Sequence, residues 1–318
     1  MKEKLKFIDL FAGIGGFHLA FHDLGAECVF ASEIDAHARV TYETNFKKIS
    51  PRLFKKNLFN RDITTIDDPS YQIPDFDVLC AGFPCQPFSQ AGFKRGFEEA
   101  KGDRGNMFFH LANIIAAKRP KAIFLENVRH LVKHDDGRTF ETIKDILTNQ
   151  LDYVVQWKIV HASDHGLPQH RPRVFIVGFR KEDVYTKPFC FPDVEPLCLT
   201  MSDIFGGECP KKIGYTLRVG GRGSGLHDRR NWDHYLVNGE DYKLKPEQGK
   251  QMMGFPKSFV LPVSETQAMK QLGNSVAVNA VRATAKEIIK CLKSEISEEK
   301  LDSHMNVSES RCELRVAV

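Results

Sequence analysis

The stretch "FIDLFAGIGGFHLAF" at residues 7–21 decides the fold, because it joins two apolar runs through a glycine-rich turn. The first run has the length of a buried strand, and the second begins like a helix. Gly13, Gly15 and Gly16 let the backbone approach a ligand closely, and a helix N-terminus favours polar or anionic groups. The stretch therefore predicts a strand, a ligand-binding loop and a helix in succession.

The same alternation continues to about residue 180, which indicates an α/β fold with a mostly parallel, doubly wound sheet covered by helices. The predicted strands are "KFIDLF", "ECVFASE", "FDVLCAG", "KAIFLENV", "YVVQWKIV" and "RVFIVGF". Helical patterns return at 246–254 and from 275 to about 292. We expect a first domain over 1–180, a small irregular lobe over 181–250, a return to the first domain over 251–292, and a poorly ordered tail over 293–318.

Composition limits the classes of protein. The chain has 318 residues, 42% of them hydrophobic, and a formal net charge of +4, which permits nucleic-acid binding without requiring it. No apolar run has membrane-spanning length, and the N-terminus "MKEKLKFIDLF" lacks the plan of a signal peptide, so we expect a cytoplasmic protein with no membrane partner. Eight cysteines without a CxxC pair argue against zinc, and no metal is expected.

Two carboxylates follow the glycine loop at positions suited to a nucleoside. The loop is not GxGxxG, because position 18 is His, and this argues against a dinucleotide. Glu33 ends the second predicted strand, where a carboxylate commonly bonds ribose hydroxyls, and Asp62 could accept from an adenine amino group. The pattern favours a nucleoside cofactor without a pyrophosphate. A tight turn followed by a surface acid is the plainer alternative.

A thiol lies between prolines in "CAGFPCQPFS" at residues 80–89. Pro84 and Pro87 cannot continue a strand ladder, so the chain must leave the sheet there. Cys85 is therefore expected at the C-terminal edge of a strand, where open α/β sheets bind ligands. The alternative is that Cys85 is a small buried hydrophobic residue.

Three charged residues could serve that thiol. Arg171 and Arg173 lie on one side of an extended segment, and a nearby cation favours the reactive thiolate. Glu126 ends another strand and could donate a proton to a ring nitrogen if burial raises its pKa. Surface charges and a helix-capping acid remain the alternatives.

Six motifs together carry a family resemblance: "DLFAGIGG", "SEID", "GFPCQPFS", "ENV", "QHRPR" and "QLGNSVAVNAV". In this order, from about residue 7 to residue 289, they resemble the DNA (cytosine-5) methyltransferases, and the size resembles a bacterial type II restriction–modification enzyme. The resemblance implies an S-adenosyl-L-methionine-binding catalytic domain facing a target-recognition lobe, with double-stranded DNA in the cleft. It also implies a functional pairing with a restriction endonuclease, and we expect a monomer.

The resemblance also implies catalytic roles. Cys85 would add to C6 of a flipped-out cytosine and make C5 nucleophilic toward the methyl group. Glu126 would bond N3 and the amino group, while Arg173, with Arg171, would contact O2 and orient the thiol. Loss of the C5 proton and expulsion of Cys85 would then restore the aromatic ring. The base must first leave the duplex, which costs a few kcal/mol.

Further residues match the family's binding positions. For S-adenosyl-L-methionine they are Phe11, Ala12, Gly13, Ile14, Gly16, Glu33, Ile34, Asp62, Ile63, Gly82, Pro84, Asn274 and Ser275. For DNA we expect phosphate-binding positions in a mobile segment after Cys85 and a glycine-rich basic stretch in the lobe, with Arg218 and Arg222 as base readers and Arg229 and Arg230 on phosphates. The positions in the mobile segment are Ser89, Lys94, Arg95 and Arg104.

The sequence departs from the family at one block. "KPEQGKQMMGFP" has Glu247 where the first arginine of that block is expected, so the packing between the lobes is in question. "YTLRVGGRGSG" faintly resembles enzymes that act on RGCGCY.

Three other functions remain to be weighed. An NAD-dependent oxidoreductase predicts the missing GxGxxG, and a DNA-binding regulator on this fold would readily lose Cys85 or Glu126. An RNA cytosine-5 methyltransferase of the same family remains the alternative that the sequence excludes least.

Overall fold

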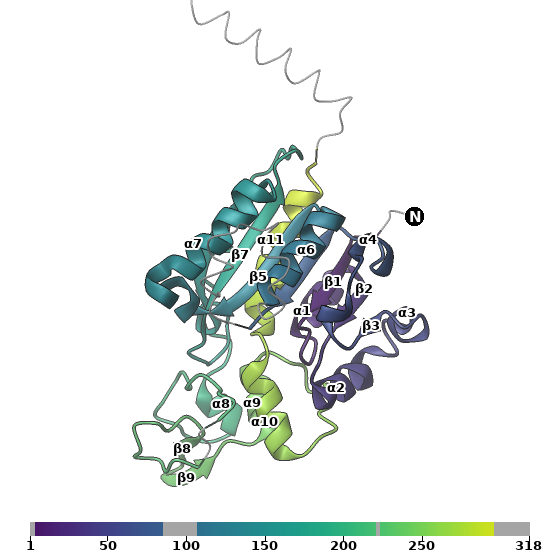
Figure 1. Ribbon diagram of the computed structural model, residues 1–318. Helices are drawn as coiled ribbons and strands as arrows, with labels where there is room; N and C mark the ends of the chain where they lie inside the picture. The colour runs from purple at the N-terminus through teal and green to yellow at the C-terminus, as the bar shows by residue number, and fades with distance from the viewer. Residues whose placement is uncertain (1–3, 85–106, 221–222, 296–318) are drawn as a thin grey trace, which may run out of the picture.

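The computed structural model describes residues 4–84, 107–220 and 223–295. Its centre is a seven-stranded sheet in the order β3-β2-β1-β4-β5-β7-β6 (Figure 1). The pairs from β3 to β5 are parallel, and β7 is antiparallel to both β5 and β6. The strands are β1 Lys6–Leu10, β2 Glu27–Ser32, β3 Phe59–Asn60, β4 Val78–Gly82, β5 Ala122–Val128, β6 Tyr153–His161 and β7 Pro172–Arg180.

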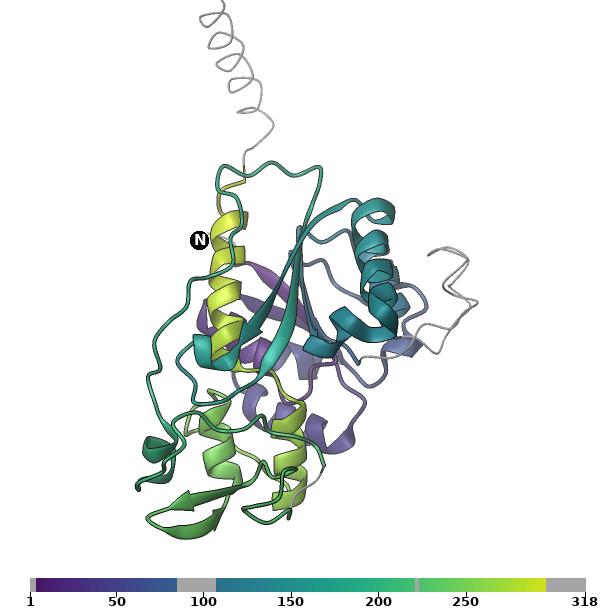
Figure 2. The same cartoon turned by 90° about the vertical axis from the view of Figure 1, so that its left-hand side faces the viewer.

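Helices cover both faces of the sheet, as Figure 2 shows with the sheet seen nearly edge-on. Alternate residues of each strand enter different cores, because successive side chains point to opposite faces. Phe7 and Val78 pack into one core with α1 Gly16–Asp23, α2 Ala36–Phe46 and α11 Val278–Leu292. Ile8 and Leu79 pack into the other with α6 Met107–Lys118 and α7 Arg138–Asp145.

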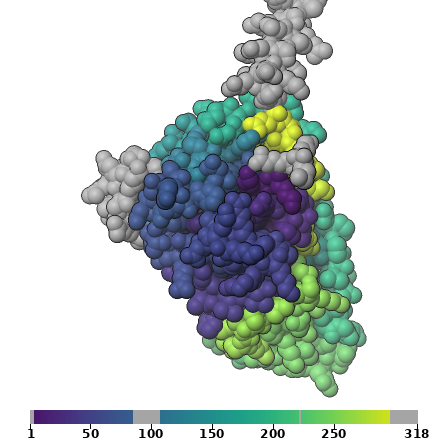
Figure 3. Space-filling view, turned by 90° about the vertical axis from the view of Figure 1, so that its right-hand side faces the viewer, coloured from purple at the N-terminus to yellow at the C-terminus, as the bar shows by residue number. Residues whose placement is uncertain are grey.

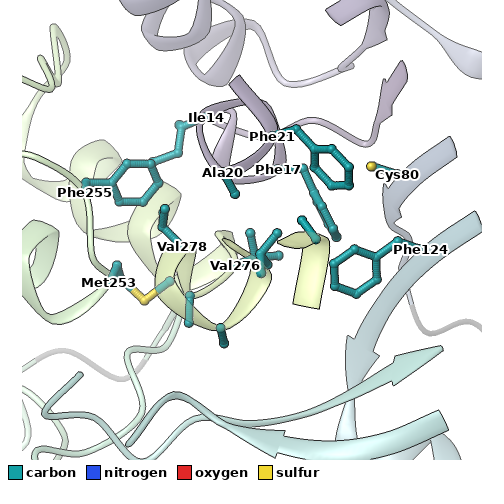
Figure 4. Packing of buried hydrophobic residues seen from close by; sticks show 14 of the residues in the cluster. Ile14, Phe17, Ala20, Phe21, Cys80, Phe124, Met253, Phe255, Val276 and Val278 are labelled. Atoms are coloured by element: carbon teal, nitrogen blue, oxygen red, sulfur yellow. The ribbon is translucent and has the colours of Figure 1, made fainter. Parts of the chain in front are cut away.

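The first of these cores joins the glycine loop to the C-terminal segment. Figure 4 shows Phe17 of α1, Phe124 of β5 and Val276 together at its centre. The Phe17 and Phe124 rings meet edge to face, 5.1 Å apart. A Cβ at Gly16 would lie 2.5 Å from Val276, so only glycine allows α1 to begin this close to the segment before α11. The core therefore fixes the loop relative to "GNSV".

Several short elements connect the main ones. They are α3 Pro51–Lys55, η1 Ile63–Thr65, α4 Pro69–Gln72, η2 Arg129–Gly137, η3 Ile146–Gln150 and η4 Ala162–Asp164. Acidic side chains begin several helices by accepting backbone N–H groups: Asp35 caps α2, Asp62 caps η1 and Asp68 caps α4.

A smaller group of elements, the lower lobe, lies below the sheet in Figure 1. It contains α8 Met201–Phe205, the antiparallel pair β8 His234–Val237 and β9 Glu240–Lys243, α9 Pro246–Met252 and α10 Glu265–Asn274. Asn238 and Gly239, both with positive φ, make the tight turn between β8 and β9. Figure 3 shows the N-terminal part of the chain in contact with this lower lobe. Asn45 of α2 donates to the carbonyl of Val260 and accepts the N–H of the same residue, each at 2.8 Å. The predicted domain limits at 180, 250 and 292 stay a prediction.

A buried lysine, Lys250, makes the main polar contacts described for the block "KPEQGKQMMGFP", which departs from the family pattern. Lys250 is 3% exposed, and its Nζ donates to the carbonyls of Lys257 and Phe259 at 3.0 and 2.9 Å. Glu247 lies 2.9 Å from the same nitrogen and balances its charge. Glu247 and Lys250 thus form a local ion pair at α9, in the block where the family pattern has an arginine in place of Glu247.

Candidate active site

One cavity of about 610 Å³ opens at the C-terminal edge of β1, β2, β4 and β5. Both parts of the molecule line it, since Thr216 to Val219 and α10 face the strand ends. Its size is within the range of small-molecule sites. Of the predicted residues, those that line it are Phe11, Gly13, Ile14, Glu33, Gly82, Pro84, Glu126, Arg173, Arg218 and Asn274.

The glycine loop and Glu33 form one end of this cavity. Phe11 and Gly13 both have φ of 54°, which turns the chain sharply after β1. Glu33 accepts the N–H of Gly13 through Oε2 and the N–H of Asp35 through Oε1, each at 2.7 Å. Burial raises the pKa of Glu33, and the two backbone N–H groups oppose that shift. The carboxylate is thus fixed at the cavity wall, with lone pairs left to accept a further hydrogen bond.

A lysine–aspartate ion pair lies at the same end of the cavity. Lys270 of α10 lies 3.1 Å from Asp35, and both side chains line the cavity. Asp35 also caps α2 through its other oxygen. This pair was not among the predicted residues, and the two members lie 235 positions apart in the sequence.

The other end of the cavity holds an acid and a guanidinium. Glu126 is 8% exposed, and its Oε1 lies 2.9 Å from Nε of Arg173. Burial raises the pKa of Glu126, and the cations of Arg173 and Arg171 oppose the shift. Burial thus shifts the pKa of Glu126 in the direction that proton donation to a ring nitrogen would require. A Cβ at Gly82 would lie 3.5 Å from Glu126 Oε2, an ordinary van der Waals contact, so Gly82 lies directly beside the acid.

Arg171 occupies a different position from Arg173. It is 1% exposed and donates to the carbonyls of Leu217 at 3.3 Å, Gly273 at 2.8 Å and Ser275. These carbonyls belong to the lower lobe, to the end of α10 and to the segment before α11. Arg171 therefore ties three chain segments around the cavity, and its structural partners are backbone groups.

The chain after β4 is held by Asn127. Its Nδ2 donates to the carbonyl of Phe83 at 2.9 Å, which fixes the last described residues before residue 85. Pro84, to which Cys85 is bonded, lines the cavity. Cys85, Ser89, Lys94, Arg95, Arg104 and Arg222 lie outside the described residues.

Some predicted cofactor residues stand away from the cavity wall. The Asp62 Oδ1 atom accepts from the N–H and the hydroxyl of Thr64, and Ile63 is buried in the core. Ile34 is 71% exposed beside Glu33, an unusual exposure for an isoleucine. Ala12, Gly16 and Ser275 lie beneath the wall, where Gly16 packs against Ser275 and Val276.

The predicted phosphate contacts differ from each other. Arg230 is exposed but pairs with Asp228 through Nε at 3.1 Å and Nη2 at 2.8 Å. That pairing holds the pKa of Asp228 down at about 2. Arg229 is exposed.

The predicted base reader Arg218 lines the cavity. Its backbone lies so close to α10 that a Cβ on Gly273 would lie 2.7 Å from it.

The fold and the site together define an α/β protein of the S-adenosylmethionine-dependent methyltransferase class. The family model described as C-5 cytosine-specific DNA methylase matches residues 5–220 and 222–290, so the chain belongs to this family. It is a DNA (cytosine-5) methyltransferase, and the family implies S-adenosyl-L-methionine as methyl donor. Among the described residues, no helix is both long and apolar enough to cross a membrane.

Similar proteins agree with that assignment. The chain is 40% identical to Type II methyltransferase M.DsaV of Dactylococcopsis salina, covering 91% of this chain and 87% of the relative. It is 37% identical to Type II methyltransferase M.HhaI of Haemophilus parahaemolyticus, covering 89% and 94%. The fold is shared with a Spodoptera frugiperda DNMT2 mutant, at a TM-score of 0.68, 21% identity and coverage of 90% and 100%. It is also shared with a putative prophage DNA modification methyltransferase from E. coli, at 0.66, 20%, and coverage of 91% and 100%.

Proposed function

We propose that this enzyme methylates C5 of a flipped-out cytosine within a short specific site of duplex DNA, and so protects the site from a cognate restriction endonuclease. One observation carries the proposal: a single cavity joins Glu33, suited to a nucleoside, to the Glu126–Arg173 pair, suited to a pyrimidine ring. Cofactor and base can therefore be held at opposite ends of one space.

The cofactor end fits S-adenosyl-L-methionine. Glu33 supplies a fixed carboxylate for ribose hydroxyls, and an added Cβ at Gly13 would meet nothing within 4 Å, so the loop leaves open space there. The Lys270–Asp35 pair offers one cation and one anion to an amino-acid group of both charges. When bound, the cofactor supplies the methyl group.

Three side chains have separate roles at the end of the cavity that would bind the base. Cys85 adds through its thiolate to C6, so that the electron pair of the C5–C6 double bond becomes available at C5. Glu126, whose pKa burial raises, donates a proton to N3 in the proposed step, as negative charge develops on the ring. Arg173 orients Glu126 through Nε and can contact O2. After C5 has gained the methyl group, water acting as a base removes the C5 proton, and the electron pair of that C–H bond re-forms the C5–C6 double bond as Cys85 leaves as a thiolate. N3 returns its proton to Glu126, which restores the ring.

The proposed partner surface is the rim formed by Thr216 to Val219 and the basic stretch that follows. RGCGCY is the proposed recognition sequence, because "YTLRVGGRGSG" resembles enzymes that act on that sequence. The enzyme is proposed to act as a monomer.

The experiment is to incubate the protein with labelled S-adenosyl-L-methionine and either unmethylated plasmid or tRNA, then map 5-methylcytosine. Methylation of plasmid at one short site is expected. Methylation of tRNA alone would contradict the DNA assignment, and labelling at another atom would contradict the chemistry.

A further inference from the structure

A buried glutamine, Gln169, joins the segment before β7 to two parts of the lower lobe. Its Oε1 atom accepts the backbone N–H of Leu217 at 3.1 Å. Its Nε2 atom donates to the carbonyl of Met252, the last residue of α9, at 3.0 Å. Gln169 is 0% exposed, so neither bond faces water. One side chain thus connects two lobe segments that lie 48 and 83 residues further along the chain.

The residues that follow Gln169 hold the same part of the lobe. Gln169 and Gly214 form a parallel β-bridge, in which the N–H of His170 donates to the carbonyl of Gly214 at 2.9 Å. Arg171 then donates to the carbonyl of Leu217 at 3.3 Å. Both backbone polar groups of Leu217 are therefore bonded to side chains of this one segment, and the backbone of Leu217 follows its position.

Helix α10 supports the next two residues of the lobe. An added Cβ on Gly273 would lie 2.7 Å from the carbonyl group of Arg218 and 3.1 Å from the backbone nitrogen of Val219, so only glycine allows this approach. Arg218 and Val219 are nevertheless exposed, and both line the cavity. The backbone is thus fixed by Gln169 at residue 217 and by α10 at the next two residues, while the side chains stay accessible to a ligand.

We propose that Gln169 is a positioning residue for sequence recognition: by fixing the backbone of Leu217, it sets which base pair the side chain of Arg218 meets. This inference rests on the proposed function. A guanidinium bonds two acceptors of one guanine only in a fixed geometry, so a backbone shift at Leu217 weakens the discrimination. Gln169 itself lies buried and need not touch DNA.

Two substitutions separate the two bonds of Gln169. Gln169→Met has a similar length and makes neither bond. Gln169→Glu keeps an oxygen that accepts the N–H of Leu217, but its carboxylate cannot donate to the carbonyl of Met252. Because recognition depends on the bond to Leu217, Gln169→Glu should keep the site preference even though it is less stable than the wild type.

Tyr153→Phe is the control for a loss of stability alone. Tyr153 of β6 is 1% exposed, and its hydroxyl donates to the carbonyl of Pro120 at 2.6 Å. The substitution takes a buried donor away from a backbone carbonyl, as Gln169→Met does at Met252, but in the sheet and not in the lobe.

The measurement is the sequencing of the duplexes that each variant retains from a randomised-site DNA library. Retention reports on recognition even where methyl transfer is lost. We expect Gln169→Met to lose roughly tenfold of the discrimination at one base pair, within the range that one bidentate base contact provides. Gln169→Glu and Tyr153→Phe should keep the wild-type preference.

A double-mutant cycle with Arg218→Ala distinguishes positioning from a general structural role. If Gln169 acts through Arg218, then Gln169→Met loosens the same base pair as Arg218→Ala and adds little to it in the double variant. A merely structural loss would act at every base pair and would add to the effect of Arg218→Ala. Should Gln169→Met fail to fold, Gly273→Ala decides the matter, because its Cβ displaces the backbone of Arg218 directly and should loosen that base pair.

The outcomes separate the two proposals. Unchanged site preference in Gln169→Met, or in Gly273→Ala where that variant decides, would overturn this inference alone. Equal loosening in Gln169→Glu or in Tyr153→Phe, or additive losses in the double variant, would also overturn it. A wild-type protein that neither selects nor methylates any DNA site would overturn the proposed function, and this inference with it.

Discussion

Replacing Glu33 with glutamine tests the cofactor site, because the carboxylate makes two backbone hydrogen bonds that an amide cannot both make. The oxygens accept from Gly13 and Asp35, each at 2.7 Å. Glutamine has one acceptor oxygen, so its NH₂ group must face one of these two N–H donors. The substitution also leaves a ribose hydroxyl without a charged acceptor.

The expected loss follows from these bonds. A hydrogen bond to a charged group contributes about 1.5–3 kcal/mol. Losing one on binding weakens the affinity for S-adenosyl-L-methionine by about 10- to 150-fold. Titration calorimetry with the cofactor measures this, and DNA affinity should stay unchanged.

Glu43→Gln is the matched control, because Glu43 is an exposed acid on α2 that pairs only with Lys47 in the described structure. It should keep wild-type cofactor affinity. An unchanged dissociation constant for Glu33→Gln would refute the placement of the ribose at Glu33.

Further changes test the core, the lobe and the DNA surface. Burial raises the pKa of Asp9 well above its usual range, so the folded protein binds this proton more tightly than the unfolded chain does. The free energy of unfolding therefore falls as pH rises above about 4 toward the folded pKa. Asp9→Asn should flatten the pH dependence of thermal unfolding, and an unchanged slope would argue against the shift. Lys250→Met leaves the carbonyl of Lys257 and the buried carbonyl of Phe259 without their donor, and should lower the free energy of unfolding by about 1–3 kcal/mol in urea titrations. A neutral result would show that water replaces the lysine. Arg218→Ala should lose about 1–3 kcal/mol of discrimination at one guanine, measured by site profiling. Arg229→Ala should instead weaken all DNA sequences equally and lower the salt slope by about one unit, and a change in site preference would contradict its assignment to phosphate.

The sheet could be predicted from the sequence because its strands are apolar runs bounded by turn-forming residues. All six quoted runs contain strands of the sheet, and its mostly parallel order is confirmed. Glu33 and Glu126 could be found because each ends such a run. Only the two-residue β3 is missing from the quoted strands, since so short a strand leaves no periodic signal.

The lower lobe was less predictable. The turn Asn238–Gly239 carries a standard hairpin signal, yet its strands have four residues each and too little alternation to stand out. Helix α10 was not predicted either, although Ser264 caps its first turn. In these elements burial comes from contacts with the rest of the lobe, so the local sequence alone gives a weak signal.

Distant pairings could not be predicted at all. The Lys270–Asp35 ion pair joins α10 to α2, and nothing near either residue in the sequence indicates the other. The carbonyl contacts of Arg171 depend likewise on where the lobe and α10 lie. Strand alternation placed Arg171 and Arg173 on one side, but only the folded chain assigns Arg173 to Glu126 and Arg171 to the backbone.

The proposed mechanism requires Cys85 to form a covalent bond to cytosine C6 during methyl transfer. The most direct measurement uses duplex DNA carrying 5-fluorocytosine at the methylated position together with S-adenosyl-L-methionine, followed by denaturing electrophoresis and mass spectrometry of the adduct. Because fluorine cannot leave C5 as a proton does, the wild-type enzyme should stay attached to the DNA, with the crosslink at Cys85, and Cys85→Ala should bind the same duplex and cofactor without forming the adduct. An absent adduct in an active wild type, or methylation by Cys85→Ala, would contradict the account.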